Sequence, residues 1–252
     1  MQKNKLSAAI VLTTAITAAA SALAETRPLD DFDAISYSLP FDVELVAATE
    51  PYVAFEGDQD TIDEIITEVD GNTLIIRQED SWFDWSDGEI YVTVGYTELT
   101  ELDMKGSGEA YAAAIDAEDL LINISGAAGV EIDQLVSNDL TIRIQGSGNV
   151  NLNDLEADAM NTMIAGSGDV EVSGNVVTQK ISIAGSGDHN ARELRSQEAD
   201  IDIAGSGDVS VWALASLQAQ VMGSGDIEYY GEPQVSERIM GSGDIEHRGD
   251  KP

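Results

Sequence analysis

The chain has 252 residues, no cysteine and a formal net charge of −35 at pH 7. The lack of cysteine excludes disulfide bonds, thiol catalysis and a lipid-accepting cysteine. The acidic balance argues against nucleic acid and anionic lipid as partners, while 43% hydrophobic residues suffice to bury a core.

Residues 1–24 have the pattern of a Sec-type signal peptide. Lys3 and Lys5 precede an apolar run over 8–20, and Ala22-Leu23-Ala24 is a small-x-small cleavage site. Cleavage after Ala24 predicts a periplasmic or extracellular protein, and the alternative is an uncleaved membrane anchor. No later stretch is long enough to span a bilayer, so no membrane insertion is expected after cleavage.

Removal of this leader takes away two lysines and no acids, which leaves 47 acids against 10 bases and a net charge of −37. Such acidity suits a salt-rich habitat or a cation-binding role.

Residues 25–100 predict an N-terminal β-rich section with one short helix. Alternating apolar residues predict strands at 32–37, 41–45, 52–55, 73–76 and 90–94. Between the third and fourth strands, residues 60–69 place four apolar side chains on one helical face. Asp60 or Thr61 supplies the N-cap, and Gly71 follows the end. We expect this helix to cover an open end or flank of the following repeat.

From residue 101 to 247 the sequence repeats. Gly-Ser-Gly occurs seven times, and a degenerate copy, Gly126-Ala127-Ala128-Gly129, fills the one gap. The first glycines are 20, 20, 20, 19, 20, 18 and 18 residues apart. They are Gly106, Gly126, Gly146, Gly166, Gly185, Gly205, Gly223 and Gly241. A constant period near 20 is typical of a repeat architecture.

In most copies, apolar residues recur two and four positions before the first glycine, and four, six and nine positions after it. Spacing by two on both sides of a glycine corner indicates short strands with one face inward. The fold class is therefore predicted as all-β: a parallel β-solenoid, like a single-stranded β-helix, of about eight 20-residue rungs. It is continuous with 25–100 as one domain, and 248–252 form a tail. The alternative, an antiparallel array of hairpins, gives no reason for a constant period.

The corner at Ala128 is expected to turn with shifted geometry, because the glycine sits one place later there.

Four segments carry a family resemblance: 32–35, 40–45, 71–76 and the Gly-Ser-Gly-Asp series. Together they resemble the putative auto-transporter adhesin, head GIN domain family of secreted bacterial proteins, over residues 29–250. The resemblance implies an all-β solenoid outside the cytoplasm and, by name, a role in adhesion. It implies no catalytic residues. The sequence departs from the family's usual Pro-x-Leu before the first Gly-Ser-Gly, with Gly95-Tyr96-Thr97-Glu98-Leu99 there.

The residue after Gly-Ser-Gly is acidic or an amide in every clear copy, and the last five are Asp169, Asp188, Asp208, Asp226 and Asp244. Stacked in register, these carboxylates would form a row that could bind calcium, which prefers several oxygen ligands. The alternative is that Asp and Asn simply favour turns.

Trp82, Phe83 and Trp85 form the densest aromatic cluster, in an acidic loop. Exposed, they could stack on sugars or anchor a partner protein. The alternative is that they pack against their own domain.

No catalytic or cofactor-binding residue is predicted. Two distant histidines, His189 and His247, predict no zinc site, and nothing resembles a nucleophile elbow. The sequence thus predicts a non-enzymatic secreted or periplasmic binding or adhesion module of the cell envelope, with a glycan or a cell-surface protein as partner. One alternative is a self-assembling structural element. A second is a calcium-dependent, polysaccharide-active β-helix. It lacks an aligned basic residue, because Arg143, Lys180, Arg192, Arg195 and Arg238 do not share a rung position.

Overall fold

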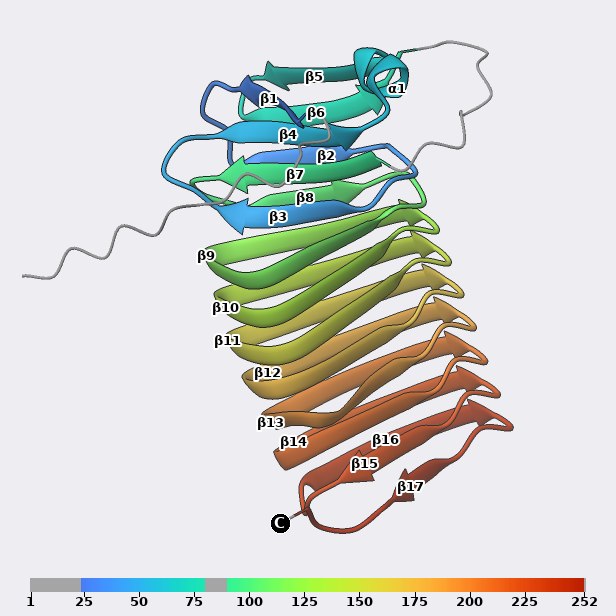
Figure 1. Cartoon of the computed structure of the whole chain (residues 1–252). Coiled ribbons are helices and arrows are strands. Elements are labelled where there is room, and N and C mark those ends of the chain that lie inside the picture. Colours follow the sequence, from blue (N-terminus) through green and yellow to red (C-terminus); the bar gives the residue numbers. More distant parts are fainter. Residues whose placement is uncertain (1–23, 80–89, 252) are drawn as a thin grey trace, which may run out of the picture.

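The computed structural model describes residues 24–79 and 90–251. These residues form one continuous sheet of seventeen strands, coiled into a rod with a smaller β-rich section at its N-terminal end (Figure 1). The all-β solenoid is confirmed. Within the described ranges, no helix has the length and apolar character needed to cross a membrane.

The N-terminal section contains eight strands and one helix. They are β1 (Ala24–Pro28), β2 (Ala34–Tyr37), β3 (Val43–Ala47), β4 (Tyr52–Gly57), α1 (Gln59–Asp63), β5 (Ile65–Asp70), β6 (Thr73–Gln78), β7 (Ile90–Tyr96) and β8 (Glu101–Met104). All five predicted strands are present, as β2, β3, β4, β6 and β7. Parallel pairing of β3 and β8 with the first long strand joins this section to the rod.

The predicted helix over 60–69 is wrong in its second half. The helix α1 ends at Asp63, and its N-cap is Asp58, whose Oδ1 accepts a hydrogen bond from the Thr61 N–H at 3.0 Å. Residues 65–70 form β5 and pair antiparallel with β6. This segment is rich in β-branched side chains, which favour a strand wherever a sheet edge is available.

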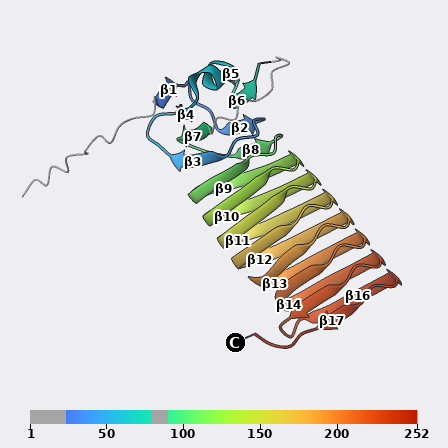
Figure 2. The same ribbon diagram turned by 45° about the vertical axis from the view of Figure 1, so that its right-hand side comes forward.

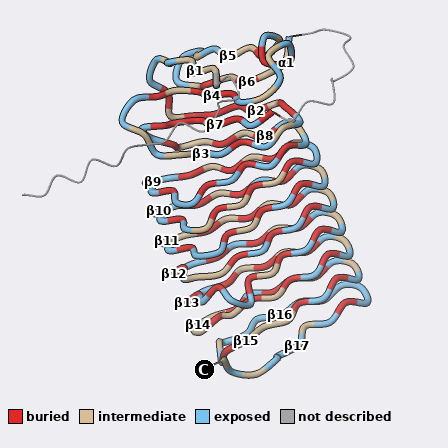
Figure 3. Tube along the Cα trace, in the orientation of Figure 1, coloured by how far each residue is buried: buried red, intermediate tan, exposed pale blue. Residues whose placement is uncertain are grey.

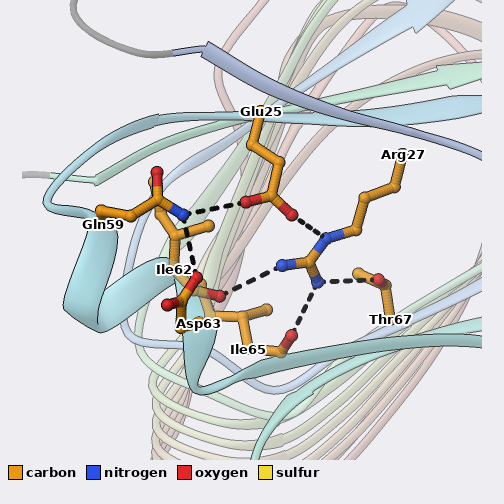
Figure 4. A network of polar contacts seen from close by, with 7 residues as sticks. All are labelled: Glu25, Arg27, Gln59, Ile62, Asp63, Ile65 and Thr67. Atoms are coloured by element: carbon orange, nitrogen blue, oxygen red, sulfur yellow. Dashed lines mark hydrogen bonds and ion pairs between the residues drawn. The ribbon is translucent and has the colours of Figure 1, made fainter.

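Arg27 fastens α1 and β5 to the edge strand β1 (Figure 4). Its guanidinium donates hydrogen bonds to the carbonyls of Ile62 (3.2 Å) and Ile65 (2.7 Å), and pairs with Glu25 at 2.6 Å. It also lies over the Phe55 ring, 4.9 Å from the centroid. This Arg27 hydrogen bond lowers the pKa of the Glu25 carboxyl. The covered N-terminal end is thus held by a polar network around one half-buried cation.

The rod consists of nine strands. They are β9 (Glu109–Gly126), β10 (Gly129–Gly146), β11 (Asn149–Gly166), β12 (Val170–Gly185), β13 (His189–Gly205), β14 (Val209–Gly223), β15 (Ile227–Tyr230), β16 (Gln234–Gly241) and β17 (Ile245–His247). All their pairings are parallel, so the hairpin alternative is wrong.

The rungs stack one on another along the rod (Figure 2). There are about seven of them, slightly fewer than the predicted number of about eight. Each strand from β9 to β14 is one rung, and β15 with β16 makes the seventh. The eight glycine corners enclose only seven intervals, and β17 ends after three residues without completing another turn.

The core is a set of stacked apolar columns inside the coil (Figure 3). In β10 the buried residues are Val130, Ile132, Leu135, Ser137, Leu140, Ile142 and Ile144. Their spacing is two within straight stretches and widens to three at two places. The β10 rung therefore bends twice opposite its glycine corner, rather than at the single second turn that the sequence predicted.

The repeats differ in length, and the resulting register shifts lie outside the glycine corners. The first glycines pair in register from Gly126 to Gly241. Register shifts occur instead near the first bend, for example between Leu152 and Leu155, opposite β12. The corner at Ala128 also keeps its register, since Gly129 pairs with Glu109 and with Asn149. The expected shifted geometry is wrong, because a 20-residue spacing leaves the ladder intact on both sides.

Candidate functional site: an acidic row and a groove along the rod

The five predicted aspartates do lie on neighbouring rungs, directly after the glycine corners. We call Asp169, Asp188, Asp208, Asp226 and Asp244 the Asp row. The backbone N–H of each later member donates to Oδ1 of the member before it, at 3.0 Å onto Asp169 and 2.8 Å onto the next three. Asp169 donates likewise to Asn149 Oδ1 at 3.3 Å. The first four carboxylates of the row thus each accept an amide hydrogen from the following rung.

This geometry gives the Asp row a structural role in stacking the corners. The carboxylates project at the exposed corner, and no group of three or more His, Asp or Glu side chains in the described ranges is arranged to hold a metal ion. Calcium binding by the row stays a prediction.

The aromatic cluster of Trp82, Phe83 and Trp85 lies at 80–89, outside the described residues. Its role in partner binding also stays a prediction.

A groove of about 700 Å³ runs lengthwise across six rungs, from β10 to β16. We call it the ladder groove. Its outer row lies seven positions before each glycine corner: Asp139, Ala159, Thr178, Glu198, Ser216 and Gln234. Its inner row lies five positions before: Thr141, Asn161, Lys180, Asp200, Gln218 and Ser236. Between them runs a floor: Leu140, Met160, Gln179, Ala199, Leu217 and Val235.

The centre of the groove holds a charged cluster on three successive rungs. Lys180 Nζ lies 2.8 Å from Asp200 Oδ2, and Gln218 Nε2 donates to Asp200 Oδ1 at 3.1 Å. The hydrogen bond to Asp200 raises the pKa of the Lys180 ammonium. The cluster therefore presents hydrogen-bonding groups whose charges are already matched.

The floor contributes packing more than ligand contact. Leu140 and Leu217 are only 1% exposed. Gln179 is buried there too, and its Nε2 donates to Ser196 Oγ at 2.8 Å. The ligand-facing surface is thus made mainly by the two polar rows, with Val235 exposed at the last rung.

Sequence reasoning missed the groove, although its signal is present. The positions five and seven before the last six corners, from Gly146 to Gly241, carry Ser, Thr, Asn, Gln, Asp, Glu or Lys with one exception among twelve, Ala159. The apolar columns that identify the solenoid contain only inward side chains. They do not show where outward side chains of successive rungs line a common groove.

The two histidines occupy unrelated places. His189 is fully buried between Val170 and Val209 on adjacent rungs, and neither ring nitrogen has a hydrogen-bond partner. Burial lowers the pKa of its imidazole to about 3. His247 stacks on Tyr229, with 4.9 Å between ring centroids.

Comparisons with known proteins agree with this architecture. A family model described as "Putative auto-transporter adhesin, head GIN domain" matches residues 31–233. A crystal structure from Parabacteroides distasonis titled "putative lipid binding protein" is 31% identical, with a TM-score of 0.84 over 91% of this chain and 97% of that chain. A "putative adhesin" from Parabacteroides merdae is 22% identical, with a TM-score of 0.85 over 91% and 96%. Another from Bacteroides fragilis is 21% identical, with a TM-score of 0.68 over 92% and 98%.

No match was found among curated protein sequences. The two putative adhesins, at 22% and 21% identity, share the fold of this chain. The matched range covers most of the chain. It includes the strands from β2 to β15. The chain therefore belongs to the putative auto-transporter adhesin, head GIN domain family.

Proposed function

We propose that the protein is a non-enzymatic binding module of the bacterial cell envelope, and that its ligand lies lengthwise in the ladder groove. The observation that carries this proposal is the continuity of the groove over six rungs, with a polar side chain at eleven of its twelve flanking positions. A surface of this kind makes many similar contacts with an extended ligand, and no single compact pocket is needed.

Export by the leader is part of the same proposal. Cleavage after Ala24 would leave Glu25 and Arg27 in place, so the network that holds α1 and β5 would persist. The mass of the exported protein tests this step, and a chain that retains residues 1–24 would contradict it.

The groove is tested by filling it. Ala159 on β11 lines the groove, while Ala165 on the same strand faces outward beside the corner and does not. Ala159→Trp should abolish retention of the protein on isolated cell envelopes, because the indole occupies the space between the two rows. Ala165→Trp is the matched control and should leave retention unchanged. Equal retention of both variants would refute the groove as the binding site.

A further inference from the structure

Given the proposed function, we infer that the ligand of the ladder groove is an uncharged, hydroxyl-rich linear polysaccharide that lies along the rod axis. Three properties of the groove lead to this class: its repeat, its hydrogen-bonding groups and its charge.

The repeat of the groove fits a polymer. Neighbouring parallel strands are about 4.8 Å apart, so six rungs present their side chains over roughly 24 Å. The inner row changes residue type along this length, from Thr141 and Asn161 through Lys180 and Asp200 to Gln218 and Ser236. A ligand with polar groups all along its length can use every rung.

The hydrogen-bonding groups fit hydroxyls. Hydroxyl and amide side chains, which both donate and accept hydrogen bonds, make up seven of the twelve flanking positions. They are Thr141, Asn161, Thr178, Ser216, Gln218, Gln234 and Ser236. Sugar hydroxyls have the same dual capacity, so each can pair with such a side chain in either direction.

An extended peptide is a poorer fit. Peptides that dock on sheets add a strand to a free edge. The ladder groove runs across β10 to β14, whose backbones are already paired on both sides within the rod, and it reaches the edge strand β16 only at its last rung. Over the other five rungs the peptide backbone would find only side chains as partners.

The charge of the groove excludes an anionic polymer. Asp139, Glu198 and Asp200 against Lys180 give three acids and one base, a net charge of −2, and the lysine is already paired with Asp200. Uronates and phosphates would meet uncompensated repulsion. An acyl chain would find a large exposed apolar side chain only at the last rung, where Val235 is 39% exposed, since Leu140 and Leu217 in the floor are 1% exposed.

Calorimetry on the full mature chain tests the ligand class. The probes are linear glucan, xylan and mannan fragments of graded length, their uronic acid counterparts, an oligolysine peptide and phosphatidylcholine vesicles. We expect a neutral fragment to bind with an affinity that rises with length until the fragment spans the groove, and that varies little with salt.

A matched pair of variants locates that binding. Gln218 and Gln220 lie on β14, and only Gln218 lines the groove. Gln218→Ala should weaken neutral-fragment binding about tenfold, while Gln220→Ala should leave it unchanged. Preference for uronates, oligolysine or vesicles, or equal effects of the two substitutions, would overturn the inference.

The two proposals fail in different ways. If Ala159→Trp blocks envelope retention but no neutral fragment binds, the ligand class is wrong and the binding role stands. If Ala159→Trp retains envelope binding, the proposed function is wrong, whatever the fragments do.

Discussion

At the scale of single residues, the third residue of each Gly-Ser-Gly corner is glycine because the backbones of neighbouring rungs approach closely there. A Cβ at Gly207 would lie 2.0 Å from the Gly187 carbonyl oxygen, whereas a Cβ at Gly129, one position after the degenerate corner, would meet only the Glu109 side chain, at 3.2 Å or more. Gly207→Ala should therefore cost about 3 kcal/mol or more in the free energy of unfolding. Gly129→Ala should change it by less than about 1 kcal/mol. Urea unfolding of both variants checks this, and equal costs would contradict the close-approach explanation.

His189 is a second residue whose effect on the free energy of unfolding can be measured. Its position is valine on both neighbouring rungs, and its ring nitrogens lack partners. His189→Val should stabilise the fold at pH 7 by about 1–3 kcal/mol, because a buried unsatisfied polar group is removed.

The same substitution should change the pH dependence. The folded pKa of His189, about 3, lies below the unfolded value of 6.5, so the unfolded chain binds the extra proton first as pH falls. Stability is then lost progressively between about pH 6.5 and pH 3, and the advantage of His189→Val should grow by about 2 kcal/mol from pH 7 to pH 5. His189→Gln, which cannot titrate, should remove the contribution of this residue to the pH dependence of stability, without the increase in stability at pH 7. Parallel pH profiles of parent and His189→Val would contradict this account.

In the Asp row, a structural role and calcium binding make different predictions. Without calcium, the free energy of unfolding of Asp208→Asn should lie within about 0.5 kcal/mol of the parent value, because an amide oxygen can still accept a hydrogen bond from the Asp226 N–H. Asp208→Ala should be less stable by about 1 kcal/mol. Calcium binding predicts that added calcium raises the melting temperature of the parent but not of the double variant Asp188→Asn, Asp208→Asn. Identical calcium responses would remove the support for a calcium site.

At the scale of elements, the rungs could be predicted because each repeats the same pattern around a glycine corner. The N-terminal section was harder. The sequence of residues 65–70 fits the pattern of a helix and that of a strand equally well. These residues form the strand β5 because they pair with the neighbouring strand β6. The ladder groove could not be read from one rung, since it depends on how outward side chains from successive rungs converge.

The last complete strand, β16, is an exposed edge. All eight of its residues are exposed, and its inward column of Ile181, Ile201 and Ala219 ends in Glu237. A charge directed inward on an edge strand opposes pairing with another chain. The opposite end of the rod is covered by α1 and β5 (Figure 1), whereas β16 leaves the C-terminal end of the rod open.

Glu237→Ile should therefore convert a monomer into a dimer with a roughly micromolar dissociation constant, because it completes an apolar edge. Light scattering across concentrations measures this. Glu232→Ile, an exposed substitution outside the strand, is the control and should stay monomeric. If the parent protein already associates through this edge, that result would favour the self-assembly alternative. It would contradict the proposal that Glu237 prevents pairing with another chain.

At the scale of the whole molecule, the chain is a rod whose glycine corners and core columns are structural, and whose binding capacity is assigned to one lengthwise groove. The chain has no cysteine, so a single introduced cysteine can carry a fluorescent label at a chosen place. Ser216 lines the groove, and Ser206 lies at an exposed corner of the same rod.

The most direct test is the fluorescence of Ser216→Cys and Ser206→Cys, each labelled with the same environment-sensitive dye, during titration with cell envelopes. The account predicts a saturable change for the groove label and none for the corner label. A change at the corner alone, or no change at either site while the protein binds, would contradict it.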